Sequence, residues 1–332
     1  MFVRRIALLT TFTAVACVSD QELDRIDAAE DAVDSVEMVH EAVSGPSTAD
    51  DSSAANQAFW EAHGELRGGI SLTAVPGGVF DMGIQPGDVD YDASHTPHEV
   101  TLTNDYWVGT TEVTVNQWLA YMDYHPTAIH VGADQAEQEL AECGDCPVHS
   151  ISWHEIAAFS NAVSEAHGLD TCFTCDGEGA DVRCELKGSP YVCEGYRLAT
   201  EAEWERAAWG GESHLYPGSD DIDAVGYYED NSGMQPHAVA TKMPNGYGLY
   251  DMGGNIREFV LDYQLGYPSE PQVDPFVGPE AGSYPAERGG SWACRIPELR
   301  PNRRNLKWDY ERDIHSGFRL ARTVADVEVT GF

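Results

Sequence analysis

The sequence predicts an α+β domain with sparse secondary structure and many loops. Two segments carry clear helix-capping signals, and two others alternate apolar and polar residues as strands do. Residues from about 60 to 325 are rich in glycine, tryptophan and tyrosine, and the stretch after Gly211 indicates short strands, turns and loops. Because long loops are uncommon inside a compact domain unless something stabilises them, we expect disulfides or metal ions to hold this part together.

The N-terminus predicts export. Residues 1–17 begin with a segment that contains Arg4 and Arg5, continue with an apolar run and end in small residues before Cys17. This is the plan of a signal peptide, and its apolar run is too short to span a membrane. Cleavage before Cys17 resembles processing of a bacterial lipoprotein, although plain secretion remains an alternative. We expect an extracytoplasmic protein, held at the membrane by a lipid anchor only.

Residues 18–60 predict an acidic, largely disordered tether, because their low hydrophobicity and high charge cannot repay the cost of ordering. Residues 61–325 are long enough for one large domain with a substantial core, which we expect to be a monomer. The chain has 19 basic and 56 acidic residues, a net charge of −37. This charge argues against nucleic-acid binding, which needs a basic face, and it suits calcium binding or solubility outside the cell.

Strands are expected at residues 77–83 and 98–109, where apolar and polar residues alternate between turn glycines. A helix is expected after Thr114, with Trp118 and Met122 at helical spacing. The sequence "SHTPHEV" contains His95 and His98, which could bind a metal ion. A loop that enters a strand is the favoured interpretation.

Two further helices are expected from their capping boxes. In the first, Ser152 is the N-cap, Glu155 lies three residues later and Gly168 marks the end. The second begins at Thr200, has Glu203 at the capping-box position, and ends at a pair of glycines.

Six cysteines occur in close-spaced groups: Cys143, Cys146, Cys172, Cys175, Cys184 and Cys193. Four of them could form a zinc site, but an oxidising compartment favours disulfides. The sequence does not give the connectivity. If the six cysteines pair completely, Cys17 is left for a lipid and Cys294 remains a free thiol.

Six blocks occur along the chain in the order found in one enzyme family. They are "AVPGGVFDMG", "TEVTVNQW", "PVHSISW", "YRLATEAEWERAAWGG", "NGYGLYDMGGNIREF" and "RGGSWAC…GFRLAR". From about Gly69 to Arg322 the chain thus resembles the formylglycine-generating enzyme, or sulfatase-modifying factor, family. The resemblance implies a divergent C-type-lectin-like fold. It also leads us to expect core positions for the block tryptophans (Trp118, Trp153, Trp204 and Trp292), and buried pairs that involve Glu112 and Arg197.

The resemblance implies a copper site in the last block. Members of the family use O₂ and copper(I), held by two cysteines five residues apart, to oxidise a sulfatase cysteine to formylglycine. Cys294 falls on the first position and Ser291 on a residue that would shape the pocket, but the second position is Leu299. One thiolate could bind copper(I) weakly, with help from His315. An inert, buried thiol at Cys294 is the favoured alternative.

The resemblance also implies a Ca²⁺ site. Its ligands become Asp251, the carbonyls of Gly254 and Ile256, and Glu258. Oxygen donors on a glycine-containing loop suit a hard cation, although a solvent-facing glycine turn remains the alternative.

The sequence therefore predicts two alternative functions. The first is a formylglycine-generating oxidase that acts on a cysteine of a sulfatase-like polypeptide. The second is a non-catalytic, lectin-like module of the cell envelope that binds a protein or glycan and has lost the copper pair. The leucine at position 299 leaves the enzyme assignment uncertain.

Overall fold

The computed structural model describes residues 66–84, 96–130, 132–282 and 284–323. These residues lie in the second of two compact units, residues 45–332. The expected signal peptide with Cys17, the expected tether and His95 lie outside the described residues. Within the described ranges no helix is both long and apolar enough to cross a membrane.

Within the described ranges the helices are short, and only three of them exceed five residues. The α-helices are α3 (Val115–Leu119), α4 (Pro126–His130), α5 (Ala133–Cys143), α6 (Trp153–Ala166), α7 (Glu201–Trp209) and α8 (Ile222–Val225). Short 3₁₀ turns are η2 (Arg67–Gly69), η4 (Gly179–Asp181), η5 (Pro190–Val192) and η6 (Ile296–Leu299).

The strands form four small sheets. The first has the order β1 (Leu72–Val75), β4 (Tyr106–Gly109), β13 (Leu320–Thr323), β7 (Arg197–Leu198). The second has the order β11 (Arg304–Leu306), β10 (Pro285–Arg288), β8 (Arg257–Tyr263), β12 (Ser316–Gly317). A third sheet contains β2 (Gly78–Met82), β3 (His98–Leu102) and β9 (Gln272–Val273), and a hairpin contains β5 (Phe173–Asp176) and β6 (Arg183–Leu186).

The capping signals are confirmed. Ser152 and Thr200 each accept a hydrogen bond from the backbone N–H three residues later, and Glu155 and Glu203 complete the two capping boxes. Helix α7 ends at Gly210, which adopts the left-handed conformation that glycine permits. Thr114 also forms a capping box, but α3 spans only five residues.

The alternating segment at residues 98–109 forms two strands instead of one. Residues 98–102 are β3, which pairs with β2, whereas residues 106–109 are β4, which pairs with β1 and β13 in another sheet. Three consecutive polar residues, Thr103, Asn104 and Asp105, interrupt the alternation, and the chain passes from one sheet to the next at this interruption. His98 is buried at the start of β3, and burial lowers the pKa of its imidazole.

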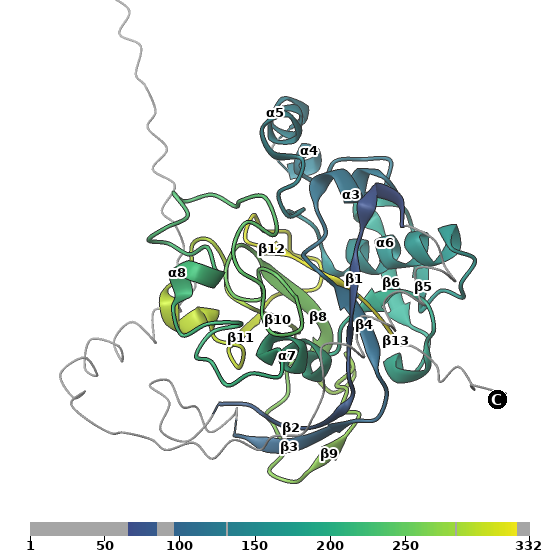
Figure 1. Cartoon of the computed structure of the whole chain (residues 1–332). Helices are drawn as coiled ribbons and strands as arrows, with labels where there is room; N and C mark the ends of the chain where they lie inside the picture. Colours follow the sequence, from purple (N-terminus) through teal and green to yellow (C-terminus); the bar gives the residue numbers. More distant parts are fainter. Residues whose placement is uncertain (1–65, 85–95, 131, 283, 324–332) are drawn as a thin grey trace, which may run out of the picture. The chain divides into compact units, whose positions relative to one another are not determined.

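The core lies between the sheets and the two longer capped helices. Helix α6 contacts β5, β6 and β7, while α7 contacts β2, β3, β8 and β10; Figure 1 shows α7 beside β8 and β10, with β2, β3 and β9 grouped together below them. The four block tryptophans are all buried, as predicted. Trp118 stacks on Phe159 of α6 with ring centroids 5.1 Å apart, which links α3 to that helix.

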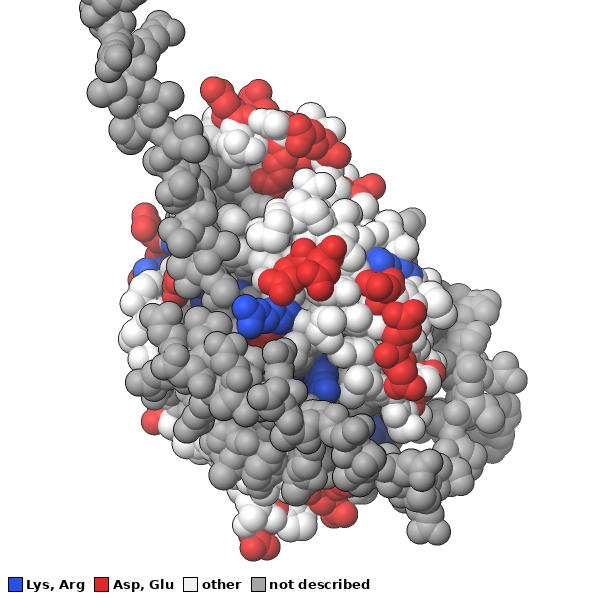
Figure 2. Space-filling view, turned by 90° about the vertical axis from the view of Figure 1, so that its left-hand side faces the viewer, with Lys and Arg blue, Asp and Glu red and all other residues white. Residues whose placement is uncertain are grey.

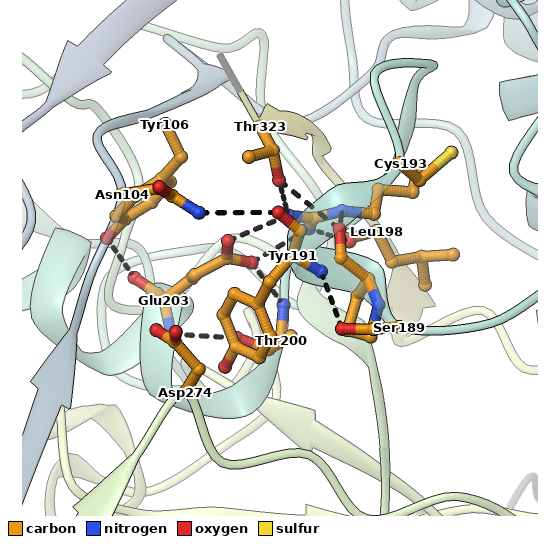
Figure 3. Close-up of polar contacts among 12 residues, drawn as sticks. Asn104, Tyr106, Ser189, Tyr191, Cys193, Leu198, Thr200, Glu203, Asp274 and Thr323 are labelled. Atoms are coloured by element: carbon orange, nitrogen blue, oxygen red, sulfur yellow. Dashed lines mark hydrogen bonds and ion pairs between the residues drawn. The ribbon is translucent and has the colours of Figure 1, made fainter. Parts of the chain in front are cut away.

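Arg197 joins α7 to the first sheet from a fully buried position. Its guanidinium donates to both carboxylate oxygens of Glu203 at 2.8 Å and to the hydroxyl of Thr323 at 2.6 Å. Figure 3 shows Glu203, Leu198 and Thr323 around one network of polar contacts. The buried pair expected for Arg197 is therefore confirmed, with Glu203 as its partner.

Three disulfides hold the cysteine-rich region, as predicted. Cys143 pairs with Cys146, Cys172 with Cys193, and Cys175 with Cys184. The last two are nested, and Cys175 and Cys184 lie opposite each other across the β5–β6 hairpin. They hold the insertion between α6 and β7, which contains little other regular structure.

Acidic residues dominate the charge of the chain, which has 56 acidic and 19 basic side chains. Figure 2 shows more acidic than basic surface among the described residues of the face that it displays. Several arginines, including Arg197, Arg288 and Arg319, are fully buried, which reduces the positive charge that reaches solvent.

Candidate functional site

The two segments to which the sequence assigns metal ligands lie beside each other. The amide of Gly254 donates to the carbonyl of Gly289 at 2.7 Å, and the amide of Trp292 donates to the carbonyl of Asn255 at 2.9 Å. The predicted calcium loop and the predicted copper segment therefore form one backbone-linked unit. It is held on one side by β8, which begins at Arg257.

Cys294 lies in a turn, and its sulfur is buried. Its amide donates to the carbonyl of Ser291 at 2.9 Å, and its Sγ lies 3.4 Å from the Ser291 Oγ. The side chains that were expected to share a pocket are thus brought together. Cys294 is 1% exposed and Ser291 is fully buried, so neither presents a polar atom to solvent.

Cys294 is disulfide-bonded, which differs from the free thiol expected from the sequence. The other six cysteines of the described residues pair with one another. The remaining cysteine of the sequence is Cys17, which lies outside the described residues. The expectation of a free thiol assumed that Cys17 carries a lipid, and a sulfur in a disulfide is neither a thiolate ligand nor a nucleophile.

Leu299 occupies the second copper-ligand position with an apolar, fully buried side chain. It ends η6, and its Cδ2 lies 2.7 Å from the point where a Cβ on Gly290 would be placed. Its carbonyl lies 2.8 Å from the corresponding point on Gly253. The glycines on both sides are therefore needed for close packing against Leu299, and this position helps to form the core of the unit.

His315, considered as a helper ligand, is held by other partners. Its Nδ1 lies 2.6 Å from the Asp313 Oδ1, and its ring lies 4.5 Å from that of Trp292. Burial of Asp313 would raise its carboxyl pKa, but hydrogen bonds from His315 and Lys307 hold that pKa well below its ordinary value. Asp313 therefore stays ionised and fixes the orientation of the imidazole ring.

Asp251 has one carboxylate oxygen without a partner. Its Oδ2 accepts a hydrogen bond from the amide of Ala240 at 2.7 Å, while Oδ1 is buried and has no hydrogen-bond partner among the described residues. Burial, the largest cause, raises the pKa of Asp251 to about 6. An orphaned, buried carboxylate oxygen is costly in free energy, and a cation or a proton would relieve that cost.

Glu258 is already neutralised by the protein. Its two carboxylate oxygens accept hydrogen bonds from Arg319, at 2.6 Å from Nε and 2.7 Å from Nη2. The indole Nε1 of Trp204 also donates to Glu258, at 2.7 Å. Glu258 keeps acceptor capacity for a cation, but it does not need one.

Glu112, which the sequence did not assign to this site, also lies here. It is fully buried, and neither carboxylate oxygen has a hydrogen-bond partner among the described residues, so the buried pair expected for it is wrong. Burial first, and then the charge of Asp251, raises its pKa well above the ordinary value. The sequence signal was a glutamate between Thr111 and Val113 in "TEVTV", which does not reveal what the side chain faces.

The remaining predicted calcium ligands are the backbone carbonyls of Gly254 and Ile256. Gly254 has φ of 93°, and a Cβ there would lie 2.2 Å from the carbonyl oxygen of Tyr227, so only glycine fits. Ile256 is fully buried. The donor set suits a hard cation through the orphaned oxygens of Asp251 and Glu112. Within the described ranges, however, no three His, Cys, Asp or Glu side chains are already gathered as a metal cluster.

Comparison with known proteins agrees with this arrangement. Residues 67–324 match the model of the sulfatase-modifying factor enzyme 1-like domain. The chain is 27% identical over 253 residues to chaperone protein LppX of Paenibacillus barcinonensis, covering 68% of this chain and 79% of that protein. It is 37% identical over 153 residues to the formylglycine-generating enzyme of Streptomyces coelicolor, covering 41% of this chain and 48% of the enzyme.

Among solved structures, variable protein 1 of Treponema denticola is similar, with a TM-score of 0.64 and 29% identity over 77% of this chain and 95% of that one. The names of these relatives describe different activities, so they support a shared fold more than a shared reaction. The family model nevertheless covers almost every described residue. The chain therefore belongs to the sulfatase-modifying factor, or formylglycine-generating enzyme, family.

Proposed function

We propose that this protein is an extracytoplasmic binding module that keeps the fold of its family without the copper chemistry. It would recognise a protein or glycan of the cell envelope. Three disulfides in the described region and the similarity to LppX are consistent with a location outside the cytoplasm.

The observation that carries this proposal is the burial of Leu299 at the second copper-ligand position. A leucine side chain has no donor atom, and here it packs against Gly290 with its Cδ2 2.7 Å from the point where a Cβ on that glycine would be placed. The disulfide at Cys294 adds to this, because it removes the thiolate at the first position. The conclusion does not require that disulfide, since one thiolate beside a leucine is still only half of a two-cysteine site.

We further propose that Asp251, the carbonyls of Gly254 and Ile256, and Glu258 hold Ca²⁺ as a structural ion. The ion would offset the buried negative charge at Asp251, whose Oδ1 has no hydrogen-bond partner among the described residues. Its effect would be to stabilise the backbone that connects this loop to the Cys294 segment. Lipid attachment at Cys17 is a separate proposal. A sulfur that carries a lipid cannot also form a disulfide, so a lipid-bearing Cys17 could not pair with another cysteine.

The deciding experiment offers a Cys-x-Pro-x-Arg peptide to the purified, copper(I)-treated protein under O₂ and follows the peptide by mass spectrometry. We expect the cysteine to remain unconverted and copper(I) binding to be weak. The matched variant is Leu299→Cys in reduced protein, which supplies a second thiol and should raise copper(I) affinity. Conversion by the unmodified protein that disappears in Cys294→Ala would overturn the proposal and identify an oxidase.

A further inference from the structure

Trp308, Tyr310 and the half-buried Tyr284 form an aromatic cluster at the surface. Trp308 is 46% exposed and Tyr310 is 51% exposed. The rings of Trp308 and Tyr310 lie 27° from parallel with centroids 5.6 Å apart. Tyr284 meets Trp308 edge-on, with centroids 4.3 Å apart. Large aromatic side chains that share one exposed surface mark interaction sites more often than scattered ones do.

The backbone beneath the cluster is fixed on two sides. The amide of Lys307 donates to the carbonyl of Pro285, which extends the β10–β11 pairing toward Tyr284 and Trp308. On the other side, the carbonyl of Asp309 accepts a hydrogen bond from the amide of Trp153 at the start of α6. The rings are thus presented by an ordered segment, and binding a partner would cost little ordering entropy.

A second anchor lies three residues further on. Arg312 forms an ion pair with Glu155 of α6 at 2.8 Å and donates to the carbonyl of Ala180. The amide of Ser150 donates to the carbonyl of Asp313 at 2.9 Å. The chain between these anchors therefore keeps Trp308 and Tyr310 on the surface, because the polar residues that alternate with them are attached to the protein.

Elsewhere in the described chain, cations of the protein itself cover aromatic rings. These pairs are Arg206 over Phe80, Lys242 over Tyr227, Arg288 over Trp204, Arg304 over Tyr267 and Arg322 over Tyr196. Among the described residues no Lys or Arg lies over the ring of Trp308 or Tyr310. Therefore no cation of the described residues competes for these two rings, which stack on each other and are about half exposed.

Two carboxylates alternate with these aromatic residues along the chain. The side chain of Asp309 is 31% exposed, with Oδ2 near Tyr263 and His154, and that of Glu311 is 44% exposed beside Lys307. The net charge of −37 adds a long-range attraction for basic partners. A guanidinium can stack on an aromatic face while it donates planar hydrogen bonds to a carboxylate, and a lysine ammonium cannot do both as well.

We propose that the surface formed by Tyr284, Trp308 and Tyr310, with Asp309 and Glu311, binds an arginine side chain in a basic segment of a partner polypeptide. This deepens the binding role proposed above and rests on it. The aromatic rings would supply the stacking surface, and Glu311 and the Asp309 oxygen that does not face Tyr263 and His154 would accept the guanidinium hydrogen bonds. The ordered backbone holds this segment in place.

The test measures binding of a hexa-arginine and a hexa-lysine peptide by isothermal titration calorimetry in 0.15 M and 0.5 M NaCl. Charge attraction alone would treat the two peptides alike and would vanish at the higher salt. We expect the arginine peptide to bind more tightly at both salt concentrations. In Trp308→Leu, affinity for it should fall roughly three- to fivefold, as loss of an exposed cation–π contact implies, and the preference for arginine should disappear.

Leu215→Ala serves as the matched control, because it shortens another exposed apolar side chain and should leave both affinities unchanged. Trp308→Phe keeps an aromatic face and should retain part of the preference. Equal affinities for the two peptides, or a Trp308→Leu variant that binds as the unmodified protein does, would overturn the site. Trp308-dependent binding to phosphatidylcholine vesicles without any arginine preference would overturn it too, in favour of a quaternary ammonium ligand.

A pull-down from envelope extract separates failure of this site from failure of the binding role. If Trp308→Leu still captures the partners of the unmodified protein, only the arginine site is contradicted. If the unmodified protein captures no partner, the binding role itself is contradicted.

Discussion

Arg319 and Glu258 form a fully buried ion pair with two hydrogen bonds, and Glu258 is also the glutamate that the family pattern assigns to calcium. Arg319 donates further to the carbonyls of Gly109 and Tyr250, so it joins β4, β8 and the calcium loop. This pair makes the fold independent of an ion at Glu258. Asp251 and Glu112 have buried carboxylate oxygens without hydrogen-bond partners among the described residues. A cation would therefore stabilise the site mainly through these two side chains.

Glu258→Gln should be strongly destabilising. The change leaves the Arg319 guanidinium buried without its counter-charge, which costs about 3–5 kcal/mol of unfolding free energy. Urea unfolding in EDTA measures the loss without any contribution from calcium. The control is the exposed pair Arg295–Glu229, 3.8 Å apart, where Glu229→Gln should cost less than about 0.5 kcal/mol. Similar losses at the two positions would contradict the role assigned to the buried pair.

Calcium should raise the melting temperature, and EDTA should lower it. If Ca²⁺ binds the folded protein at Asp251, a concentration one hundred times its dissociation constant adds about 2.7 kcal/mol. Asp251→Ala should abolish the response, whereas the exposed Asp230→Asn should keep it. A melting temperature that EDTA leaves unchanged would show that Asp251 and Glu112 are served by a shared proton or by water.

The helix starts, the disulfides and the tryptophan core could be predicted because each depends on local signals or on pairing by residue type. The hydrogen bonds of Ser152, Thr200 and their glutamates lie within one helical turn. Glu112 and Asp251 could not be related in this way, because their interaction depends on the tertiary fold. Within residues 98–109, by contrast, the polar run at residues 103–105 interrupts the alternation where the chain passes between two sheets.

The oxidation state of Cys294 shows a second limit of prediction from the sequence. A resemblance to a two-cysteine site identifies the position of the sulfur, but its oxidation state depends on which other cysteine is available in space. The sequence reasoning reserved Cys17 for a lipid and so left Cys294 free. Burial of Leu299 was not predictable either, since a leucine at that position could equally have lined an open pocket.

The outer disulfide should stabilise the protein more than the short one. Cys172 and Cys193 are 21 residues apart, whereas Cys143 and Cys146 are 3 apart. In the chain-entropy model these loops contribute about 3 and about 2 kcal/mol respectively. Thermal unfolding of the two double alanine variants gives the comparison. A larger loss for Cys143→Ala/Cys146→Ala would mean that native contacts around α5 outweigh loop entropy.

Cys294 should not react with a thiol reagent in denatured, unreduced protein. Its sulfur is disulfide-bonded, so alkylation is expected only after a reductant is added. Mass spectrometry of the peptide that contains Cys294 measures the modification, and Cys294→Ala provides the blank. One labelled thiol without reductant would contradict the disulfide and would favour a lipid on Cys17.

Asp262 should make the protein less stable as the pH rises from about 4 to about 7. Its carboxyl is fully buried, and this burial, followed by the charge of Glu201, raises its pKa to about 7. The unfolded chain releases this proton near pH 4, so between the two values the folded state holds more protons and loses stability as they leave. Three pKa units correspond to about 4 kcal/mol, fully lost above pH 7.

Urea unfolding at pH 5 and pH 8 measures this loss, and Asp262→Asn should reduce the difference between the two. Asp262 accepts hydrogen bonds from the amides of Glu201 and Val277, so the asparagine variant places an amide donor against one of them and is less stable at pH 5. The expected signature is therefore a lower unfolding free energy with a flatter pH dependence. The exposed Asp170→Asn should keep the original slope, and an unchanged slope in Asp262→Asn would assign the effect to another buried carboxylate.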